Sequence, residues 1–322
     1  MNKLNVDCLY LIFYNNLDRI SLFPCLLVNK EWCNIVVPIL WKTYSGYPLR
    51  HEEKMDNTIL SCLLPSSKQL LSDNNIKLPS TILSNPPLFN YISFCEFPNT
   101  YIINKIVQNM FEEKIYENTN SCNLLEQEIY KLFVSQCKDI KELYWDTSQP
   151  LPLFPGALAC FSQLCYLCID ANIVNSNSMY EMARICKDLN NLVINNCQDL
   201  PGLISLVDAQ RNLKCVTIIP NKDREETCKE LGKALTRKRN AINYLDLHTV
   251  RIIPPSFLTL LVNLKRFYYY KQKNYEDTKE RIEEFQHYLT ILEFPDLERL
   301  SVERLSCFKE LAMLIERTKG NI

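Results

Sequence analysis

A triplet of apolar residues with the spacing apolar-x-x-apolar-x-apolar recurs through the second half of the chain, and it constrains the fold more than any other feature. The seven triplets are Ile140-Leu143-Trp145, Leu164-Leu167-Ile169, Leu189-Leu192-Ile194, Leu213-Val216-Ile218, Ile242-Leu245-Leu247, Leu264-Phe267-Tyr269 and Leu297-Leu300-Val302. Successive triplets begin 24, 25, 24, 29, 22 and 33 residues apart. One such triplet arises by chance about once in ten positions at this hydrophobic content, so only the series is informative. The series predicts seven short strands, one in each repeated unit.

The spacing matches that of leucine-rich repeats, in which units of about 20–29 residues each turn three apolar side chains of one strand into the interior. Such repeats also place Asn or Cys three positions after the triplet, where the side chain satisfies turn amides. Three consecutive units have Asn172, Cys197 and Asn221 at this position. The other four units have Ser148, Val250, Gln272 and Leu305. The repeats are therefore regular in the middle of the array and degenerate at its ends.

Helical segments with one apolar face lie between the triplets. Examples of these faces are Met179, Met182, Ala183 and Cys186; Cys228, Leu231 and Leu235; Ile282, Phe285 and Leu289; and Leu311, Leu314 and Ile315. A strand followed by a helix cannot bury its own apolar edge, so successive units must stack. We therefore predict an α/β fold in which residues 139–322 form a curved solenoid of parallel strands with helices on the convex side. Ile322 lies 25 residues after Leu297, where a further strand is expected, so we expect an array that is incomplete or completed by a partner.

Composition argues against several classes of function. The chain has 322 residues and a formal net charge of -1, which argues against a broad electrostatic contact with nucleic acid or with an anionic membrane. The five glycines are isolated from one another, so no glycine-rich phosphate loop is expected. The three histidines, His51, His248 and His287, are far apart in the sequence. We therefore predict a non-catalytic protein with no cofactor.

The fifteen cysteines are scattered within apolar patterns. No cationic region followed by an apolar run opens the sequence, and no apolar segment approaches the roughly 20 residues that span a bilayer. We therefore expect buried, reduced thiols in a cytoplasmic or nuclear protein without a membrane partner. Cys165-x-x-Cys168 has zinc-ligand spacing, but both residues fall on a predicted strand and no second pair follows, so no metal site is predicted.

Residues 4–41 contain more large apolar side chains than a module of this size can bury. Roughly 40 residues is the lower limit for an independent core, so part of this surface is expected to be covered by another molecule. Asp7 can accept from the free amides of a first helix, and Asn29 can cap a third helix. Pro38 is expected to bend the chain near the end of this stretch. The stretch is therefore predicted to be a helical docking module.

The same stretch resembles the F-box family. The matching residues, in order and spacing, are Leu4, Leu9-x-x-Ile12-Phe13, Leu17, Val28-x-x-x-Trp32 and Leu40-Trp41. The match is specific, because the Val-x-x-x-Trp and Leu-Trp elements fall at set distances from the first leucine. One departure is Asn5, where the family usually has proline. Residues 25–41 are especially similar to fungal F-box proteins that carry degenerate leucine-rich repeats.

The resemblance implies the substrate-recognition subunit of an SCF-type cullin–RING ubiquitin ligase. The F-box would dock on a Skp-family adaptor, and through it on cullin, while the repeats would bind a target protein. The residues implied in adaptor binding are Leu4, Asn5, Leu9, Ile12, Phe13, Val28, Trp32, Leu40 and Trp41. The alternative interpretation is a small helical cap on the repeats, in which these residues form a private core.

The middle of the chain is predicted to join the two parts rigidly. Two amphipathic helices are expected near residues 101–113 and 124–136, and residues 88–97 are expected to form a strand or a buried connector. Pro65 interrupts an earlier stretch with helical periodicity. The predicted domains are the F-box, 1–42; a mostly helical connector, 43–138; and the repeats, 139–322.

Side chains that alternate with the buried triplets would project from the concave surface, because successive strand residues point to opposite faces. Tyrosine and arginine are enriched where few contacts carry most of the binding energy. The predicted target-binding residues are Tyr166, Tyr244, His248, Arg266, Tyr268, Tyr270 and Arg299. The alternative is an ordinary amphipathic surface, since tyrosine is abundant throughout the chain.

Other functions remain open on the sequence alone. The first is an adaptor-bound scaffold or receptor that does not engage a cullin, and the second is a receptor with a small molecule in the solenoid. The basic run at residues 233–239 could contact an acidic partner, although a solvated helix end is the favoured interpretation. No nucleic-acid partner is predicted.

Overall fold

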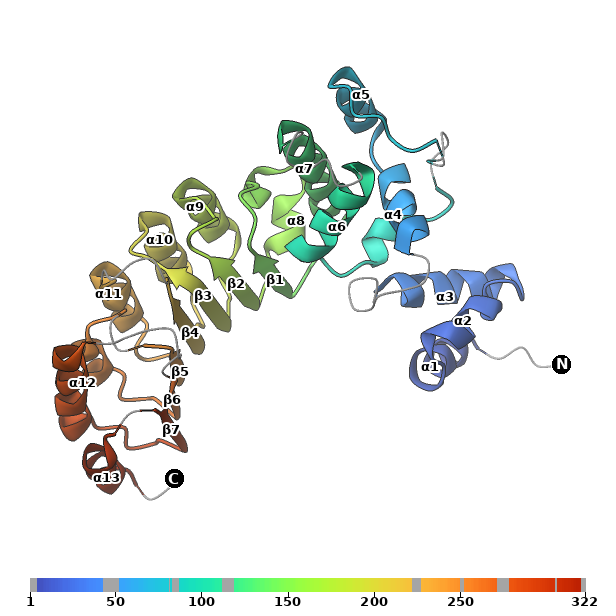
Figure 1. The fold of residues 1–322 in the computed structure, drawn as a ribbon. Helices are drawn as coiled ribbons and strands as arrows, with labels where there is room; N and C mark the ends of the chain where they lie inside the picture. Colours follow the sequence, from blue (N-terminus) through green and yellow to red (C-terminus); the bar gives the residue numbers. More distant parts are fainter. Residues whose placement is uncertain are drawn as a thin grey trace. The chain divides into compact units, whose positions relative to one another are not determined.

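The computed structural model describes residues 5–42, 52–80, 82, 87–111, 119–221, 227–249, 252–270, 278–304 and 306–319. Leu4, which the sequence assigns to adaptor binding, lies outside the described residues. The chain has an α/β fold, in which N-terminal helices are followed by a parallel sheet that alternates with helices (Figure 1). It divides into two compact units. The first comprises residues 1–140 and 154–160, and the second comprises residues 141–153 and 161–322.

The first unit is helical. Its elements are α1 (Val6–Asn16), α2 (Arg19–Cys25), α3 (Lys30–Lys42), α4 (Glu52–Ser61), α5 (Pro65–Asp73), the 3-10 helix η2 (Tyr91–Phe94), α6 (Thr100–Phe111) and α7 (Thr119–Gln136). Both helices expected in the middle of the chain are confirmed as α6 and α7. The run at residues 88–97 forms a connector with a 3-10 turn rather than a strand. Pro65 begins α5, where a proline without an amide hydrogen is tolerated.

Asparagine and aspartate side chains begin the first three helices. The predicted capping role of Asp7 is wrong, because Asn5 is the N-cap of α1 and its side chain accepts from the Asp7 amide at 3.2 Å. Asp18 caps α2, and Asn29 Oδ1 accepts from the Trp32 amide at 2.8 Å, as expected for the cap of α3. Pro38 lies inside α3, which continues to Lys42.

The second unit contains seven parallel strands that pair in sequence order. They are β1 (Glu142–Trp145), β2 (Tyr166–Asp170), β3 (Asn191–Cys197), β4 (Cys215–Pro220), β5 (Tyr244–Leu247), β6 (Arg266–Tyr270) and β7 (Arg299–Glu303). Every triplet predicted from the sequence therefore contributes a strand. The register aligns equivalent triplet residues, since Leu143 pairs with Leu167 and Leu167 pairs with Leu192.

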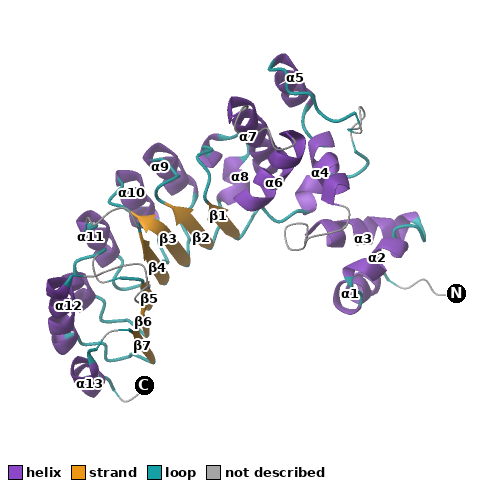
Figure 2. Cartoon of the chain, viewed as in Figure 1, coloured by secondary structure: helices purple, strands orange, loops and turns teal. Residues whose placement is uncertain are grey.

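Helices alternate with these strands and cover one face of the sheet (Figure 2). They are α9 (Ser176–Ile185), α10 (Pro201–Ala209), α11 (Lys229–Arg237), α12 (Lys279–Ile291) and α13 (Phe308–Glu316), with short turns at η4 (Leu151–Leu153) and η5 (Pro255–Leu260). The short helix α8 (Ala157–Phe161) belongs to the first unit except for its last residue. From β1 to β6 the triplet residues on the strands are at most 4% exposed. Leu300 and Val302 of β7 are only half-buried. The core of this unit therefore lies between the sheet and its helices.

Polar side chains link neighbouring units where the strands end. Asn172 Oδ1 accepts from Asn221 Nδ2 at 2.7 Å and from the Gln198 side-chain amide. Asn172 and Asn221 were expected to satisfy turn amides, and these bonds join them to each other across two repeated units.

None of the described helices is both long enough and apolar enough to cross a membrane.

Candidate functional site

The first candidate surface lies on α1 and α2 and the turn that follows them. Nine large apolar or aromatic side chains here are each at least 40% exposed. They are Val6, Tyr10, Leu11, Ile12, Tyr14, Ile20, Phe23, Leu27 and Val28, and we call them the apolar helical surface. Monomeric proteins rarely expose apolar residues at such density without a partner. This surface is therefore a candidate docking site.

Four residues that the sequence assigns to adaptor binding lie inside the unit. Leu9, Phe13, Leu40 and Trp41 are at most 8% exposed. The reason is helix packing: Leu9 and Phe13 are one turn apart on the side of α1 that faces α3, and Phe13 meets Trp32 edge to face with ring centroids 4.9 Å apart. Leu9 and Phe13 therefore belong to the core of the module, which is the role that the alternative interpretation gave them, whereas Trp41 packs on Tyr91 of η2 with ring centroids 4.6 Å apart.

Two other assigned residues, Ile12 and Val28, do face solvent, at 40% and 55% exposure. Trp32 is half-buried, and Asn5 is exposed at the start of α1. Sequence reasoning missed the rest of the apolar helical surface. The available signal was helical spacing, because Val6, Tyr10 and Tyr14 recur every four residues and share a face of α1.

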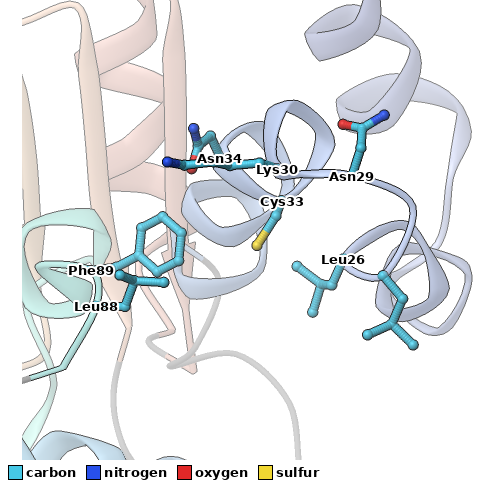
Figure 3. Close-up of a pocket in the computed structure, with 8 residues that line it drawn as sticks. Leu26, Asn29, Lys30, Cys33, Asn34, Leu88 and Phe89 are labelled. Carbon is cyan, nitrogen blue, oxygen red and sulfur yellow. The ribbon is translucent and has the colours of Figure 1, made fainter.

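A hollow of about 400 Å³ lies beside this surface (Figure 3). Its lining comprises Leu26, Leu27, Asn29, Lys30, Cys33, Asn34, Leu88 and Phe89. Figure 3 shows the Cys33 sulfur facing the space between Leu26 and Phe89, with Asn29, Lys30 and Asn34 above it. The apolar lining suits an apolar side chain, and Leu27 belongs both to this hollow and to the apolar helical surface.

The second candidate surface is the face of the sheet opposite the buried triplets, which we call the open face. Two pairs of tyrosines lie on it. Tyr144 and Tyr166 have ring centroids 5.5 Å apart, and Tyr244 and Tyr268 have centroids 5.3 Å apart. Tyrosine phenols are ordinarily protonated at neutral pH, and burial raises the pKa of Tyr166 and of Tyr244 further, so both can donate hydrogen bonds.

A third aromatic group stands at the carboxyl ends of β5 and β6. His248 meets Tyr270 edge to face at 5.9 Å, and its Nε2 lies 3.6 Å from an Asp246 carboxylate oxygen. The guanidinium of Arg304 lies over the Tyr270 ring at 5.1 Å. His248 and Tyr270, both predicted to bind the target, thus lie together. Arg304 was missed, because its contact depends on a left-handed backbone conformation (φ 60°) just after β7.

Arg266 and Arg299 are in register on neighbouring strands, and both are exposed. Neither forms an ion pair within the described part of the chain, whereas the adjacent Lys265 and Glu298 pair at 2.8 Å. Two like charges opposite one another on a sheet destabilise it. An anionic group placed between the two guanidinium groups would relieve that repulsion.

The structure separates the predicted target-binding residues into two groups. Tyr166 lies with Tyr144 on β1 and β2, whereas the remaining six residues lie on or directly after β5, β6 and β7. The strands β3 and β4 stand between the two groups. The open face is therefore one surface with two aromatic regions.

The other sequence candidates have structural partners. Cys165 Sγ contacts the Lys141 carbonyl at 3.3 Å, and Cys168 Sγ accepts from the Asn195 amide at 3.3 Å. Within the described residues, no three potential metal ligands lie together. In the basic run, Lys233 pairs with Glu230, and Arg237 pairs with an aspartate of α10.

The chain matches no protein-family model, and no curated protein matches it either.

Proposed function

We propose that this chain is the substrate-recognition subunit of an SCF-type cullin–RING ubiquitin ligase. The observation that carries the proposal is the apolar helical surface, nine large exposed side chains on a module of three short helices. A Skp-family adaptor would cover these side chains, as the F-box resemblance implies. Burying a side chain of this size contributes about 1.5–3 kcal/mol, so even partial coverage supports a stable complex.

The F-box contact surface in this proposal differs from the set implied by the sequence motif. Ile12 and Val28 remain in it, and Leu11, Phe23 and Leu27 join it because they are exposed. Leu9 and Phe13 support this surface from beneath, since they lie buried where α1 packs on α3, and Leu40 and Trp41 are buried at the end of α3. The hollow beside Leu27 would receive an apolar side chain of the adaptor.

The repeats would form the curved solenoid that the triplet spacing predicts, and the open face would be its target-binding side. The chain would act by proximity, with no bond chemistry of its own. A bound target is held near the ubiquitin-charged enzyme, and its lysines reach a high effective concentration there. The polar and aromatic side chains of the open face are of the types that carry binding energy at protein interfaces.

Co-expression with a Skp-family adaptor tests the docking step. The variant Leu11→Asp with Val28→Asp places two carboxylates in the proposed contact without touching the core. We expect adaptor recovery in a pulldown to fall at least about tenfold, because each buried, unpaired carboxylate costs more than the roughly 1.4 kcal/mol that a tenfold change needs. Circular dichroism of the variant checks that the helices are retained.

Leu158→Asp is the matched control, since Leu158 is 67% exposed and lies outside the three-helix module. This variant is expected to recover adaptor at the wild-type level. Wild-type recovery by the double variant would refute the docking assignment. Probing the same pulldown for cullin separates a ligase subunit from an adaptor-bound scaffold, because the scaffold would bring down adaptor alone.

A further inference from the structure

We propose that the open face binds an extended, charge-polarised segment of a target protein, lying across the strands with its acidic end over β6 and β7. This inference rests on the proposed target-binding role of the open face and names the chemistry of the segment. Its basis is one line of side chains that runs across all seven strands. In register order, this cross-strand row is Glu142, Tyr166, Asn191, Cys215, Tyr244, Arg266 and Arg299.

The row is asymmetric in charge. A carboxylate stands at the β1 end, two tyrosines and two small polar residues fill the middle, and two arginines stand at the β7 end. Glu142, Arg266 and Arg299 are all exposed. After Lys265, which has the larger effect, both arginines contribute to the lowered pKa of the Glu298 carboxyl, but among the described residues neither arginine forms an ion pair. Both guanidinium groups can therefore donate hydrogen bonds to a carboxylate of another molecule.

Other acidic side chains of the open face lie at both ends of the sheet, away from the row. Asp170 lies on β2, where its carboxylate accepts from Asn196 Nδ2 at 2.7 Å and from the Asn172 amide at 2.8 Å. Asp146 directly follows β1. Asp246 on β5 and Glu303 on β7 are their counterparts at the arginine end. The charge difference therefore rests on the row itself, where a basic end of the bound segment would meet Glu142 and its acidic end would meet the arginine pair.

The two tyrosine pairs set the spacing of the anchors. Tyr166 and Tyr244 are three strand steps apart in the row, which corresponds to about 14 Å at about 4.8 Å per step. An extended chain advances about 3.3 Å per residue, so two apolar anchors about four residues apart would reach both pairs. Tyrosine pairs provide flat, amphipathic contact area for such anchors.

The polarity of the row argues for a protein segment rather than a nucleic acid. A phosphate backbone would be attracted to Arg266 and Arg299, but its continuation across the sheet would meet the Glu142 carboxylate. A peptide can reverse its charge over the length of the row, whereas a nucleic acid cannot. The segment is therefore expected to be acidic at one end and basic at the other.

Selection from a random 12-residue peptide library displayed on phage, against the immobilised full chain, tests the inference. We expect enriched peptides to carry acidic residues at one end, basic residues at the other and apolar or aromatic residues about four positions apart. Against the variant Arg266→Glu with Arg299→Glu, the acidic enrichment should disappear. Measured by fluorescence anisotropy, the affinity of a wild-type-selected peptide should fall at least about tenfold.

Lys233→Glu is the control, because Lys233 lies on α11 in the helical layer, and its peptide preferences should equal those of the wild type. Enriched peptides without charge segregation, or an acidic preference that survives the double arginine variant, would overturn the inference. Displacement of selected peptides by a single-stranded oligonucleotide would indicate a nucleic-acid site and would also overturn it.

The same variants separate this inference from the proposed function. The double arginine variant keeps the apolar helical surface, so it should recover adaptor like the wild type. If this variant loses peptide binding and still recovers adaptor, the two arginines act in segment binding alone. Charge-segregated peptide binding without any adaptor recovery would leave the open-face inference standing and remove the ligase assignment.

Discussion

The three-helix module and the parallel sheet differ in how far their apolar side chains are buried. In the module, nine large side chains on and after α1 and α2 are exposed, although the pattern of the stretch is strongly apolar. In the sheet, the strand triplets from β1 to β6 are at most 4% exposed, and tyrosines, arginines and acids face outward. The module thus presents an apolar surface to a partner, while the sheet presents a polar and aromatic one.

Size and stacking explain this difference. A module of roughly 40 residues has too little interior to cover its apolar side chains. In the sheet, each strand and helix lies against the next unit, so the apolar edge of one is buried by its neighbour. From β1 to β6 the strand triplets are buried by the chain itself, whereas the apolar side chains on α1 and α2 are not.

The largest expected difference between the two regions is the loss of stability when a leucine is replaced by alanine. Leu192 is fully buried in β3, and Leu192→Ala is expected to lower the free energy of unfolding by about 2–5 kcal/mol, because it removes packed atoms and leaves a cavity. Leu11→Ala, at a leucine that is 55% exposed, should change it by less than about 0.5 kcal/mol. Urea denaturation followed by circular dichroism measures both. Equal losses would mean that Leu11 is part of a core.

The rate of thiol labelling should show the second largest difference between the two regions. Burial raises the pKa of Cys186 to about 11, so at pH 8 only about one thiol in a thousand is the reactive thiolate. Cys8 of the module is exposed. Iodoacetamide labelling followed by mass spectrometry should modify Cys8 at least about tenfold faster. Raising the pH toward 11 should narrow the difference, provided that the protein stays folded. Comparable labelling at pH 8 would contradict the buried position of Cys186.

The cap of α1 offers a smaller effect within the module. Asn5→Ala removes the oxygen that accepts from the Asp7 amide and should destabilise the helix by about 1 kcal/mol. Asn5→Asp keeps an acceptor and is the control. Asn5→Pro is compatible with the backbone, since Asn5 has φ -62°, but it also loses the cap. Thermal unfolding ranks the variants, and an alanine variant as stable as the wild type would show that the cap contributes nothing.

A still smaller change should stabilise the sheet unit. Ser178 Oγ is buried in α9 and has no hydrogen-bond partner among the residues that the structure describes, so Ser178→Ala should raise stability by about 0.5–1 kcal/mol. Ser176→Ala is the matched contrast two residues away, because Ser176 Oγ accepts from the Gly202 amide and its loss should destabilise. Urea denaturation of both variants should therefore give changes of opposite sign. A loss at Ser178 would point to a hydroxyl contact.

Periodicity in the sequence was enough to predict the strands and most helices. The seven triplets, α6 and α7 are local patterns, and local hydrophobic spacing determines which segments become strands or helices. The N-cap of α1 was less predictable, because neighbouring polar residues compete for the same free amides. Asn5 and Asp7 both offer a side-chain oxygen, and only the backbone geometry selects between them.

The candidate sites required the tertiary structure. Leu9 and Ile12 belong to the same apolar pattern, yet packing of α1 on α3 buries the first and leaves the second exposed. The cross-strand row depends on register between units of 22 to 33 residues, where loop lengths differ and only the hydrogen-bonded ladder aligns Glu142 with Arg299. The sequence by itself determined the order and type of the repeated elements through local periodicity. Contacts between elements decided which side chains meet and which face a partner, because those contacts join residues that are far apart in the chain.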